Sequence, residues 1–442
     1  MASASFHALC EAEALVCAAS LFTPPGGERG LVVGTRVPKG EPLLAVPWEL
    51  VLRADASDVQ SAADVLPHHL AVASELLRLT SASSDAGLSR RERLWRAWSL
   101  QLPRPHDLTH PAALSAEALR AAHDDALLRA MASRRERVAA LLAEPARPLG
   151  EAWAHWAYAM VSSRPFLFAR PSAAPHARAQ FAFVPFIDMT NHASEPNCEV
   201  RGVEADGGEG YQAVELVALR DLRPGEAATI SYDVEELSSR DLYSTFGFVT
   251  DESHRNDRLP TPPKTLTPLN STALNSTTHR LLHLGASPAF IGAVRASLSS
   301  TSHTEAGRGW SCEAEAAAAS AHFDWLKAEF PQELATHSID DDAALHELEA
   351  MGRASTATYS MLRYRIGRRR LWEVALQVLQ EHIESHNDCS NEAGRLGSHL
   401  RAYLPYLAVL FAFAAGVSHL RSVEREGRKA SMKRKMQARI KK

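Results

Sequence analysis

Two stretches of the chain combine the composition of buried strands with polar side chains that can do chemistry. Within residues 181–200, an apolar run rich in Phe, Val and Ile leads into a turn that carries Asp188, Asn191 and His192. These three side chains are costly to bury without partners, so they predict a polar site at the end of a buried strand. Each has a structural alternative, because Asp188 and Asn191 can cap a turn and His192 can be a hydrogen-bonded core histidine.

The second stretch is residues 224–233, in which a Pro-Gly turn feeds a short strand that ends near Tyr232. A phenol ionises near pH ~10, so it is a poor general base at neutral pH but an effective hydrogen-bonding group. Taken alone, Tyr232 can be a strand tyrosine packed in the core. We expect the two stretches to form one active site.

The elements that must position these residues follow from the remaining pattern. Residues 1–23 are predicted to form an amphipathic N-terminal helix, without the features of a signal or transit peptide. Residues 24–250 are predicted to be the main domain, which begins with a glycine-rich, hairpin-like segment at 24–47. Ala, Leu, Glu and Arg at helical spacing in residues 55–160 predict a helical insertion into this domain.

The C-terminal part is predicted to be mainly helical. A polar segment rich in Pro and Thr, 251–275, is expected to be a linker, and 276–385 to form a helical domain in which the basic cluster 368–370 is a solvated helix face. Residues 386–442 form an extension with a basic tail. Its uncharged segment 402–420 just reaches the ~17–25 residues of a membrane-spanning helix. A tail anchor in an organelle membrane and an ordinary core helix are the two alternatives for this segment.

Composition narrows the class of protein. The 442 residues are 45% hydrophobic and 23% charged, which is ordinary for a soluble globular protein. The net charge of the chain is −4. Residues 421–442 contain ten Lys or Arg against two Glu, so residues 1–420 carry −12 by subtraction. This negative charge argues against nucleic-acid binding by residues 1–420. The chain has five cysteines and no C-x-x-C pair, which indicates neither a disulfide framework nor a metal site. We therefore expect a reducing compartment. We expect a cytoplasmic monomer.

Four motifs in this order resemble a SET-domain protein-lysine methyltransferase. They are Glu28-Arg29-Gly30-Leu31, Ser163-Arg164-Pro165-Phe166, Asp188-Met189-Thr190-Asn191-His192 with Pro196-Asn197, and Gly225-Glu226 with Ile230-Ser231-Tyr232. Their spacing is similar to that of the RuBisCO large-subunit methyltransferase-like subgroup, in which a helical insertion splits the SET domain and a helical substrate-binding domain follows. The resemblance covers residues 20–385 and implies an α+β fold. That fold is a SET β-fold of short strands with a helical insertion, followed by an all-α C-terminal domain.

The resemblance also implies a function, the transfer of methyl groups from S-adenosyl-L-methionine to a lysine side chain of a non-histone protein. It implies cofactor binding by Glu28, Arg29, Gly30, Leu31, Arg164, Asn191 and His192. It further implies a lysine channel lined by Ser163, Phe166, Asp188, Phe246 and Phe248, with Tyr232 as the catalytic residue that orients the amine. Methyl transfer is an in-line displacement, so positioning of the reacting atoms and exclusion of water dominate the chemistry. The lysine proton is expected to leave to water.

Three positions depart from the family pattern. The usual Y-G-F is Phe246-Gly247-Phe248 here, Ser239 stands where Asn is common, and Asp233 stands where many members have Gly. The missing phenol at Phe246 removes a hydrogen-bonding group near the amine and leaves room for an extra methyl group. We therefore predict dimethyl or trimethyl rather than monomethyl products.

Two other functions stay open on the sequence. A sister branch of the family methylates histidine in actin, but its pocket replaces the lysine-type pattern that this chain keeps in 163–166. The other alternative is an inactive SET fold that serves as a binding or scaffold protein. The matches at Asn191, His192 and Tyr232 favour an enzyme that acts on lysine.

Overall fold

The computed structural model describes residues 2–14, 16–24, 29–56, 66–168, 179–206, 210–234, 236–263, 265–267, 269, 271–283, 287–298, 311–330, 338–353 and 356–387. Contacts divide these residues into two compact units. The first unit contains the described residues within Met1–Leu259, Ser287–Ala293 and Phe330–Leu371. The second contains those within Pro260–Ala286, Val294–Glu329 and Trp372–Lys442. The predicted helical domain 276–385 therefore contributes residues to both units.

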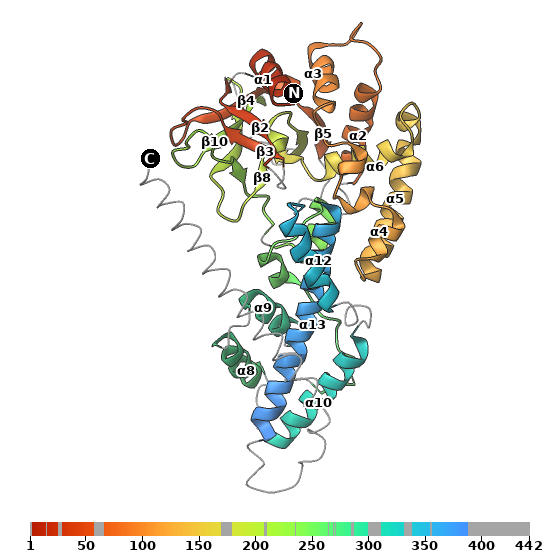
Figure 1. Cartoon of the computed structure of the whole chain (residues 1–442), viewed down its shortest axis with the longest axis vertical. Helices are drawn as coiled ribbons and strands as arrows, with labels where there is room; N and C mark the ends of the chain where they lie inside the picture. The colour runs from red at the N-terminus through yellow and green to blue at the C-terminus, as the bar shows by residue number, and fades with distance from the viewer. Residues whose placement is uncertain are drawn as a thin grey trace. The chain divides into compact units, whose positions relative to one another are not determined.

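Short strands form the sheets of the first unit (Figure 1). A four-stranded antiparallel sheet has the order β1 (Val16–Cys17), β4 (Pro42–Pro47), β10 (Tyr211–Ala218), β9 (Cys198–Glu204). A three-stranded sheet has the order β5 (Leu52–Ala56), β7 (Ala179–Phe183), β6 (Phe166–Phe168). Two smaller sheets pair β2 (Ala19–Phe22) with β3 (Gly30–Val33), and β8 (Asn191–His192) with β11 (Thr229–Ile230). With its helices, this pattern of short strands confirms the predicted α+β class.

The predicted helical insertion lies between β5 and β6. Its helices and 3₁₀ turns are α2 (Leu66–Thr80), α3 (Arg90–Ser99), η2 (Pro105–Asp107), η3 (Pro111–Ala113), α4 (Ala116–Arg120), α5 (Asp125–Ala146) and α6 (Glu151–Ser162). Ser89 and Glu92 form a capping box at the start of α3, and Asp124 accepts a 3.0 Å hydrogen bond from Leu127 N at the start of α5. Such caps satisfy backbone amides that have no partner inside the helix.

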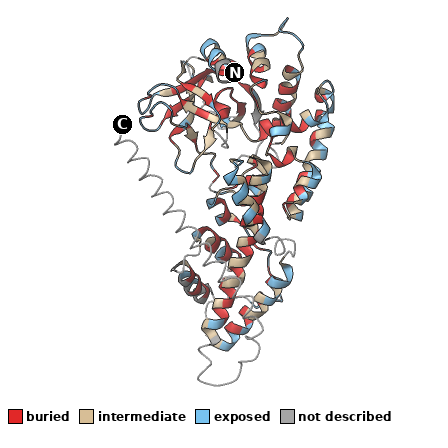
Figure 2. Ribbon diagram, viewed as in Figure 1, coloured by how far each residue is buried: buried red, intermediate tan, exposed pale blue. Residues whose placement is uncertain are grey.

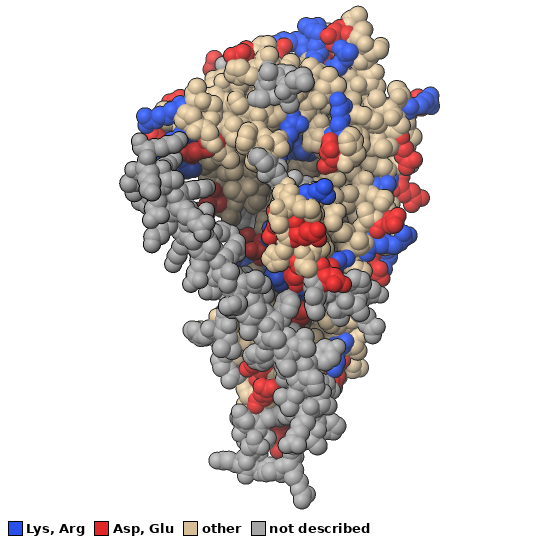
Figure 3. Space-filling view, in the orientation of Figure 1, with Lys and Arg blue, Asp and Glu red and all other residues tan. Residues whose placement is uncertain are grey.

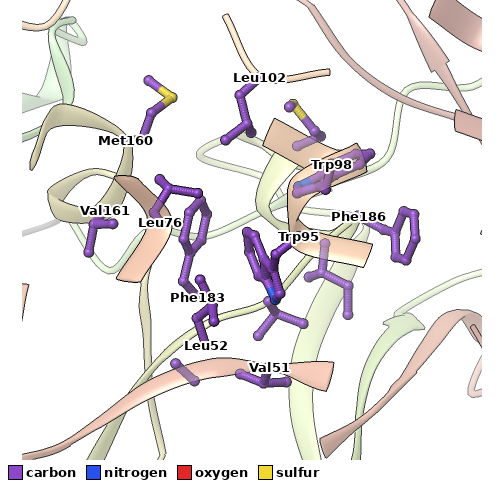
Figure 4. Packing of buried hydrophobic residues seen from close by; sticks show 14 of the residues in the cluster. Val51, Leu52, Leu76, Trp95, Trp98, Leu102, Met160, Val161, Phe183 and Phe186 are labelled. Atoms are coloured by element: carbon purple, nitrogen blue, oxygen red, sulfur yellow. The ribbon is translucent and has the colours of Figure 1, made fainter. Parts of the chain in front are cut away.

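Large aromatic side chains join the insertion to the strands. Trp95 of α3 packs on Phe183 of β7 (Figure 4), with ring centroids 4.8 Å apart. Its indole nitrogen donates to Leu50 O at 2.7 Å. Trp95, Trp98 and Phe183 are all fully buried. Each such side chain contributes roughly 1.5–3 kcal/mol by its burial, so the insertion shares one core with the strands. Figure 2 shows this arrangement as buried inner faces and exposed outer faces of the insertion helices.

The N-terminal segment differs from the predicted single helix. Helix α1 spans Ala2–Glu13, whereas Val16–Cys17 and Ala19–Phe22 are strands that pair with β4 and β3. The helix prediction is wrong for residues 16–22, because pairing with distant strands overrides a weak local preference. The cysteine pattern did not indicate disulfides, but Cys10 of α1 and Cys17 of β1 form one.

The segment predicted as a linker, 251–275, begins with a buried turn. It contains the 3₁₀ turn η5 (Glu252–Asn256), in which Ser253 and His254 are buried. The buried Asp257 carboxylate accepts hydrogen bonds from the backbone nitrogen and hydroxyl of Ser239, at 2.7 and 2.8 Å, where helix α7 (Ser239–Phe246) begins. The Asp257 carboxylate also contacts His254 Nδ1 at 2.9 Å. Residues 252–257 therefore belong to the core of the first unit rather than to a linker.

The basic cluster 368–370 is not a solvated helix face. It lies on α13 (Ala357–Asn387), and the side chain of Arg369 is 1% exposed. Arg369 pairs with Asp342 at 2.8 Å and lies 3.7 Å from Asp341, both on helix α12 (Ser338–Ala350). Arg365 also donates to both carboxylate oxygens of Asp341. The prediction failed because the acidic partners lie on another helix.

Four helical segments form the second unit. They are α8 (Ser271–His283), the end of α9 (Pro288–Leu298), α10 (Cys312–Glu329) and the end of α13. The fully buried His382 connects three of them, with its ring nitrogens 3.0 Å from Thr277 Oγ1 of α8 and 2.8 Å from Glu315 Oε1 of α10. This unit is therefore held by a buried polar contact as well as by apolar packing.

Two predictions about the C-terminal extension fall outside the described residues. Residues 402–420, for which a tail anchor and a core helix were the alternatives, and the basic tail 421–442 are not described. Among the described helices, none is long and apolar enough to cross a membrane. On the face in view, acidic and basic side chains of the described residues are interspersed (Figure 3).

The ion pairs of α12 provide a stability test. Replacement Asp341→Asn leaves Arg365 and Arg369 largely buried with one carboxylate fewer, and is expected to lower the free energy of unfolding by about 3–5 kcal/mol. Urea unfolding followed by circular dichroism measures the change. The matched control is Asp340→Asn at an exposed position on the same helix, which is expected to change stability by less than about 0.5 kcal/mol. Equal effects of the two substitutions would contradict a structural role for the buried cluster.

Candidate active site

Residues 226–230 run between β3 and β8 and bring distant parts of the first unit together. On one side, Val33 N donates to Glu226 O at 2.8 Å and Ala228 N donates to Leu31 O at 2.9 Å. On the other side, β11 pairs in parallel with β8, so that Thr229 lies opposite Asn191 and Ile230 opposite His192. The two polar stretches predicted to share one site are therefore neighbouring strands.

The Asn197 side chain secures this crossing. Its Nδ2 donates to Ala227 O and its Oδ1 accepts from Thr229 N, each at 2.8 Å. Asn197 is buried, so both halves of its amide replace lost water contacts. A two-residue parallel pairing is weak by itself, and these side-chain bonds extend it.

The predicted cofactor turn lies directly against Asn191. Its side-chain Nδ2 donates to Arg29 O at 3.2 Å, and a Cβ atom on Gly30 would lie 2.7 Å from the same nitrogen. Only glycine therefore allows this approach without a shift of Asn191. Leu31 is buried in the core, and Glu28 lies outside the described residues.

A buried carboxylate and two guanidinium groups lie close together beside this turn. Asp188 is 5% exposed, its Oδ1 accepts a 3.2 Å hydrogen bond from Trp98 Nε1, and its Oδ2 lies 4.0 Å from Arg164 Nε. Within the described part of the chain, Asp188 Oδ2 and Arg29 Nη2 are buried without a hydrogen-bond partner. Buried polar atoms are rarely left in this state, except where a ligand or water supplies the partner.

Burial dominates the ionisation of this group. It raises the pKa of Asp188 to about 7, although the positive charges of Arg164 and Arg29 and the hydrogen bond from Trp98 act in the opposite direction. Burial also lowers the pKa of the Arg29 guanidinium, which the charge of Asp188 partly offsets. A carboxylate of this kind changes its charge near neutral pH.

Tyr232 lies where β11 ends, next to His192. Its hydroxyl donates to the backbone oxygen of Thr190 at 2.8 Å, and its backbone nitrogen lies 3.3 Å from His192 Nδ1. The Tyr232 ring centroid is 5.1 Å from that of Phe246 and 6.3 Å from that of Phe248. A phenol, a backbone carbonyl and aromatic rings therefore meet at one place.

The helical insertion packs against the segment that carries Phe246 and Phe248. Gly247, between Phe246 and Phe248, has φ +82°, and a Cβ atom there would lie 3.0 Å from backbone atoms of His110. The fully buried His110 side chain contacts Ser162 Oγ at 3.3 Å, one residue before the predicted site residue Ser163. The sequence patterns of the site did not reveal Trp98 or His110, because both act through packing of the insertion.

A cavity of about 610 Å³ opens at this place, a size that suits small-molecule sites. Its lining includes six of the predicted site residues, Ser163, Arg164, Phe166, Asp188, Tyr232 and Phe246. It also includes residues that were not predicted, among them Thr190, Leu167, Cys198, Glu199 and Leu219. Arg29, Gly30, Leu31, Asn191, His192 and Phe248 do not line the cavity.

The departures from the family pattern have clear structural settings. Ser239 is fully buried and bonds Asp257, so its hydroxyl takes part in the start of α7. Asp233 has φ +51°, in the left-handed region that favours glycine, and its backbone nitrogen is 3.0 Å from Ser231 Oγ. Aspartate tolerates this region better than most residues, which accounts for its presence there.

Residues 28–233 match the family model described as the SET domain. The chain therefore contains a SET domain, as its motifs predicted. Solved structures similar to it include "Structure of Rubisco LSMT bound to AdoMet", at 16% identity and TM-score 0.51 over 92% of this chain and 99% of that one. A crystal structure of the SET domain of LSMT bound to lysine and AdoHcy aligns at 17% identity and TM-score 0.50, over 91% of this chain and 95% of that one. No curated protein matches the chain.

The raised pKa of Asp188 predicts a pH-dependent stability. The folded protein binds the proton of the Asp188 carboxyl group more tightly than the unfolded chain does. Ionisation of this group therefore does not lower the free energy of unfolding at pH values below ~4, and lowers it increasingly as the pH rises toward 7. Asp188→Asn removes this effect. The stability of the variant relative to wild type is expected to rise by at most about 1.4 kcal/mol per pH unit between pH 4 and 7, and then to level off.

Urea unfolding at a series of pH values measures this difference, with Asp206→Asn as the control at an exposed position. The control is expected to show no such rise. A stability difference for Asp188→Asn that is independent of pH would contradict the assigned ionisation.

Proposed function

We propose that this chain is an S-adenosyl-L-methionine-dependent protein-lysine methyltransferase that acts on a non-histone protein. The observation that carries the proposal is the meeting of Tyr232, the Thr190 carbonyl, Asp188 and Phe246 in one cavity. The similar LSMT structures are described as bound to AdoMet, and to lysine with AdoHcy, which supports the same pair of ligands here.

The residues beside the cavity fit the cofactor. The guanidinium nitrogen Arg29 Nη2 is a buried hydrogen-bond donor without a partner in the described part of the chain. Arg164 lies beside Asp188, as Arg29 does. Both guanidinium groups can therefore bind the cofactor carboxylate. Gly30 lets the Asn191 side chain lie against this turn, where its Nδ2 donates to Arg29 O. When bound, the cofactor supplies an electrophilic methyl group on a sulfonium. Backbone carbonyls such as that of Thr190 can align that methyl group through C–H···O contacts of about 0.5–1 kcal/mol each.

The opposite side of the cavity fits an amine. Tyr232 is held by Thr190 O and orients the lysine nitrogen, while the rings of Phe246 and Phe166 exclude water from the methylene chain. Asp188 attracts the ammonium form of the substrate into the cavity, and the proton then leaves to water before transfer. At the mouth, the exposed side chains of Glu199 and Asp233 add negative charge, which suits a lysine-bearing segment.

The function is tested with labelled S-adenosyl-L-methionine. An extract is incubated with the wild-type chain, and mass spectrometry identifies the methylated residue. Methyllysine on a non-histone protein is the expected result. Methylhistidine would overturn the assignment of the substrate residue, and the absence of transfer to any protein would favour a binding protein.

Tyr232→Phe separates positioning from binding. Because the substitution keeps the ring and removes the hydroxyl, methyl transfer is expected to fall by about 100-fold or more. The Kd for the cofactor, measured by calorimetry, is expected to change by less than about twofold. Retention of full activity would contradict the role given to the phenol.

Phe246→Tyr tests the product of the reaction. The ring of Phe246 lies 5.1 Å from that of Tyr232, so a new hydroxyl would project into the cavity near the amine. Mass spectrometry of the methylated lysine is expected to show a shift from dimethyl and trimethyl toward monomethyl product. An unchanged product mixture would show that Phe246 does not set the number of methyl groups.

A further inference from the structure

Helix α1 inserts a ring into the core behind the active site. Phe6 is fully buried, with its ring centroid 5.6 Å from that of Phe186 and 5.7 Å from that of Trp98. Phe186 and Trp98 are themselves 4.9 Å apart, so the three rings form a closed cluster. Edge-on and tilted aromatic contacts of this kind fix the relative orientation of the rings.

Two members of this cluster hold Asp188. Phe186 has φ +69°, a conformation that residues other than glycine rarely adopt and that persists only when the surroundings enforce it. Directly after it, Ile187–Met189 form a 3₁₀ turn that carries Asp188. Trp98 donates to the Asp188 carboxylate at 3.2 Å. Phe6 therefore packs against both residues that set the position of this carboxylate.

A disulfide fastens α1 in this position. Cys10 is fully buried on α1, while Cys17 is partly exposed on β1. Strand β1 has two residues and pairs with β4 through Val16 opposite Ala45 and Cys17 opposite Leu44. Glu13 at the end of α1 also accepts a hydrogen bond from Arg90 at 2.7 Å, but this pair is exposed and contributes little. The covalent bond adds to the constraint that the packing of Phe6 and Cys10 in the core places on the helix.

We propose that Cys10 and Cys17 are a redox-modification site, at which a dithiol reductant lowers methyl transfer by releasing α1 and its Phe6 from the Phe186–Trp98 pair. A thiolate of the reductant attacks the accessible Cys17 sulfur, the sulfur–sulfur bond breaks, and Cys10 leaves as a thiolate that takes up a proton. The second thiol of the reductant then attacks the mixed disulfide and releases the Cys17 thiol. The reductant is oxidised to its own disulfide.

The effect reaches the candidate site through Asp188. Asn191 and His192 are held by β11 through Thr229 and Ile230, and α1 takes no part in that pairing. Reduction is therefore expected to lower kcat/KM for the protein substrate by about threefold to tenfold. The effect on methyl transfer rests on the proposed function, whereas the disulfide and the release of Phe6 from the Phe186–Trp98 pair do not.

The first measurement is alkylation of the full-length chain with N-ethylmaleimide, before and after treatment with dithiothreitol. Peptide mass spectrometry is expected to find Cys10 and Cys17 modified only after reduction. Cys198 and Cys312, which are not in the disulfide, serve as the reference after unfolding of the alkylated protein. Alkylation of both Cys10 and Cys17 in the untreated protein would overturn the proposal.

Hydrogen exchange of the amides in 186–190 is the second measurement. Reduction is expected to increase local opening there by about tenfold or more, with little change in β10. Phe6→Leu without reductant is expected to reproduce this increase, and the control Phe22→Leu, at a side chain 49% exposed, is not. Equal exchange in oxidised and reduced wild-type protein would overturn the coupling. Neither readout requires methyl transfer, so an inactive enzyme would contradict the proposed function alone.

Discussion

Residues 226–230 are hydrogen-bonded on both sides, and the active site depends on this arrangement. One side bonds the strand that follows the Arg29–Gly30 turn, and the other bonds β8 and Asn197. Backbone groups buried in this way must find partners, so the segment cannot shift by a residue without losing several bonds at once. Because the crossing fixes the register of β11 against β8, it also fixes Tyr232 beside His192 and Thr190. The geometry of the candidate site is therefore a consequence of backbone pairing.

Asp188 illustrates what the surrounding packing adds. A carboxylate that is 5% exposed is costly to keep charged, and its neighbours Arg164, Arg29 and Trp98 offset only part of that cost. The insertion supplies Trp98, and α1 stabilises the Trp98–Phe186 pair from behind. Two elements outside the strand framework thus tune the charge and position of Asp188.

The local part of this site was predictable from the sequence. The sequence has one predicted strand that ends in polar residues and a second that ends in a tyrosine. These two strands predicted that Asn191, His192 and Tyr232 are neighbours, because motif order reflects backbone pairing. Contacts between distant elements were not predictable. The partners of Arg369 lie on α12, and the pairing of Cys10 with Cys17 depends on how α1 meets β1. Strands β1 and β2 were likewise read as helix, since their partners lie elsewhere in the chain.

The central claim is that the crossing of 226–230 builds a cofactor site at the Gly30 turn. Calorimetric titration of the full-length chain with S-adenosyl-L-methionine, wild type against Gly30→Ala, tests it most directly. The new methyl group would lie 2.7 Å from Asn191 Nδ2, so the wild-type chain is predicted to bind and the variant to bind at least about tenfold more weakly. No binding by the wild-type chain at millimolar cofactor, or equal affinity of the two proteins, would contradict the account.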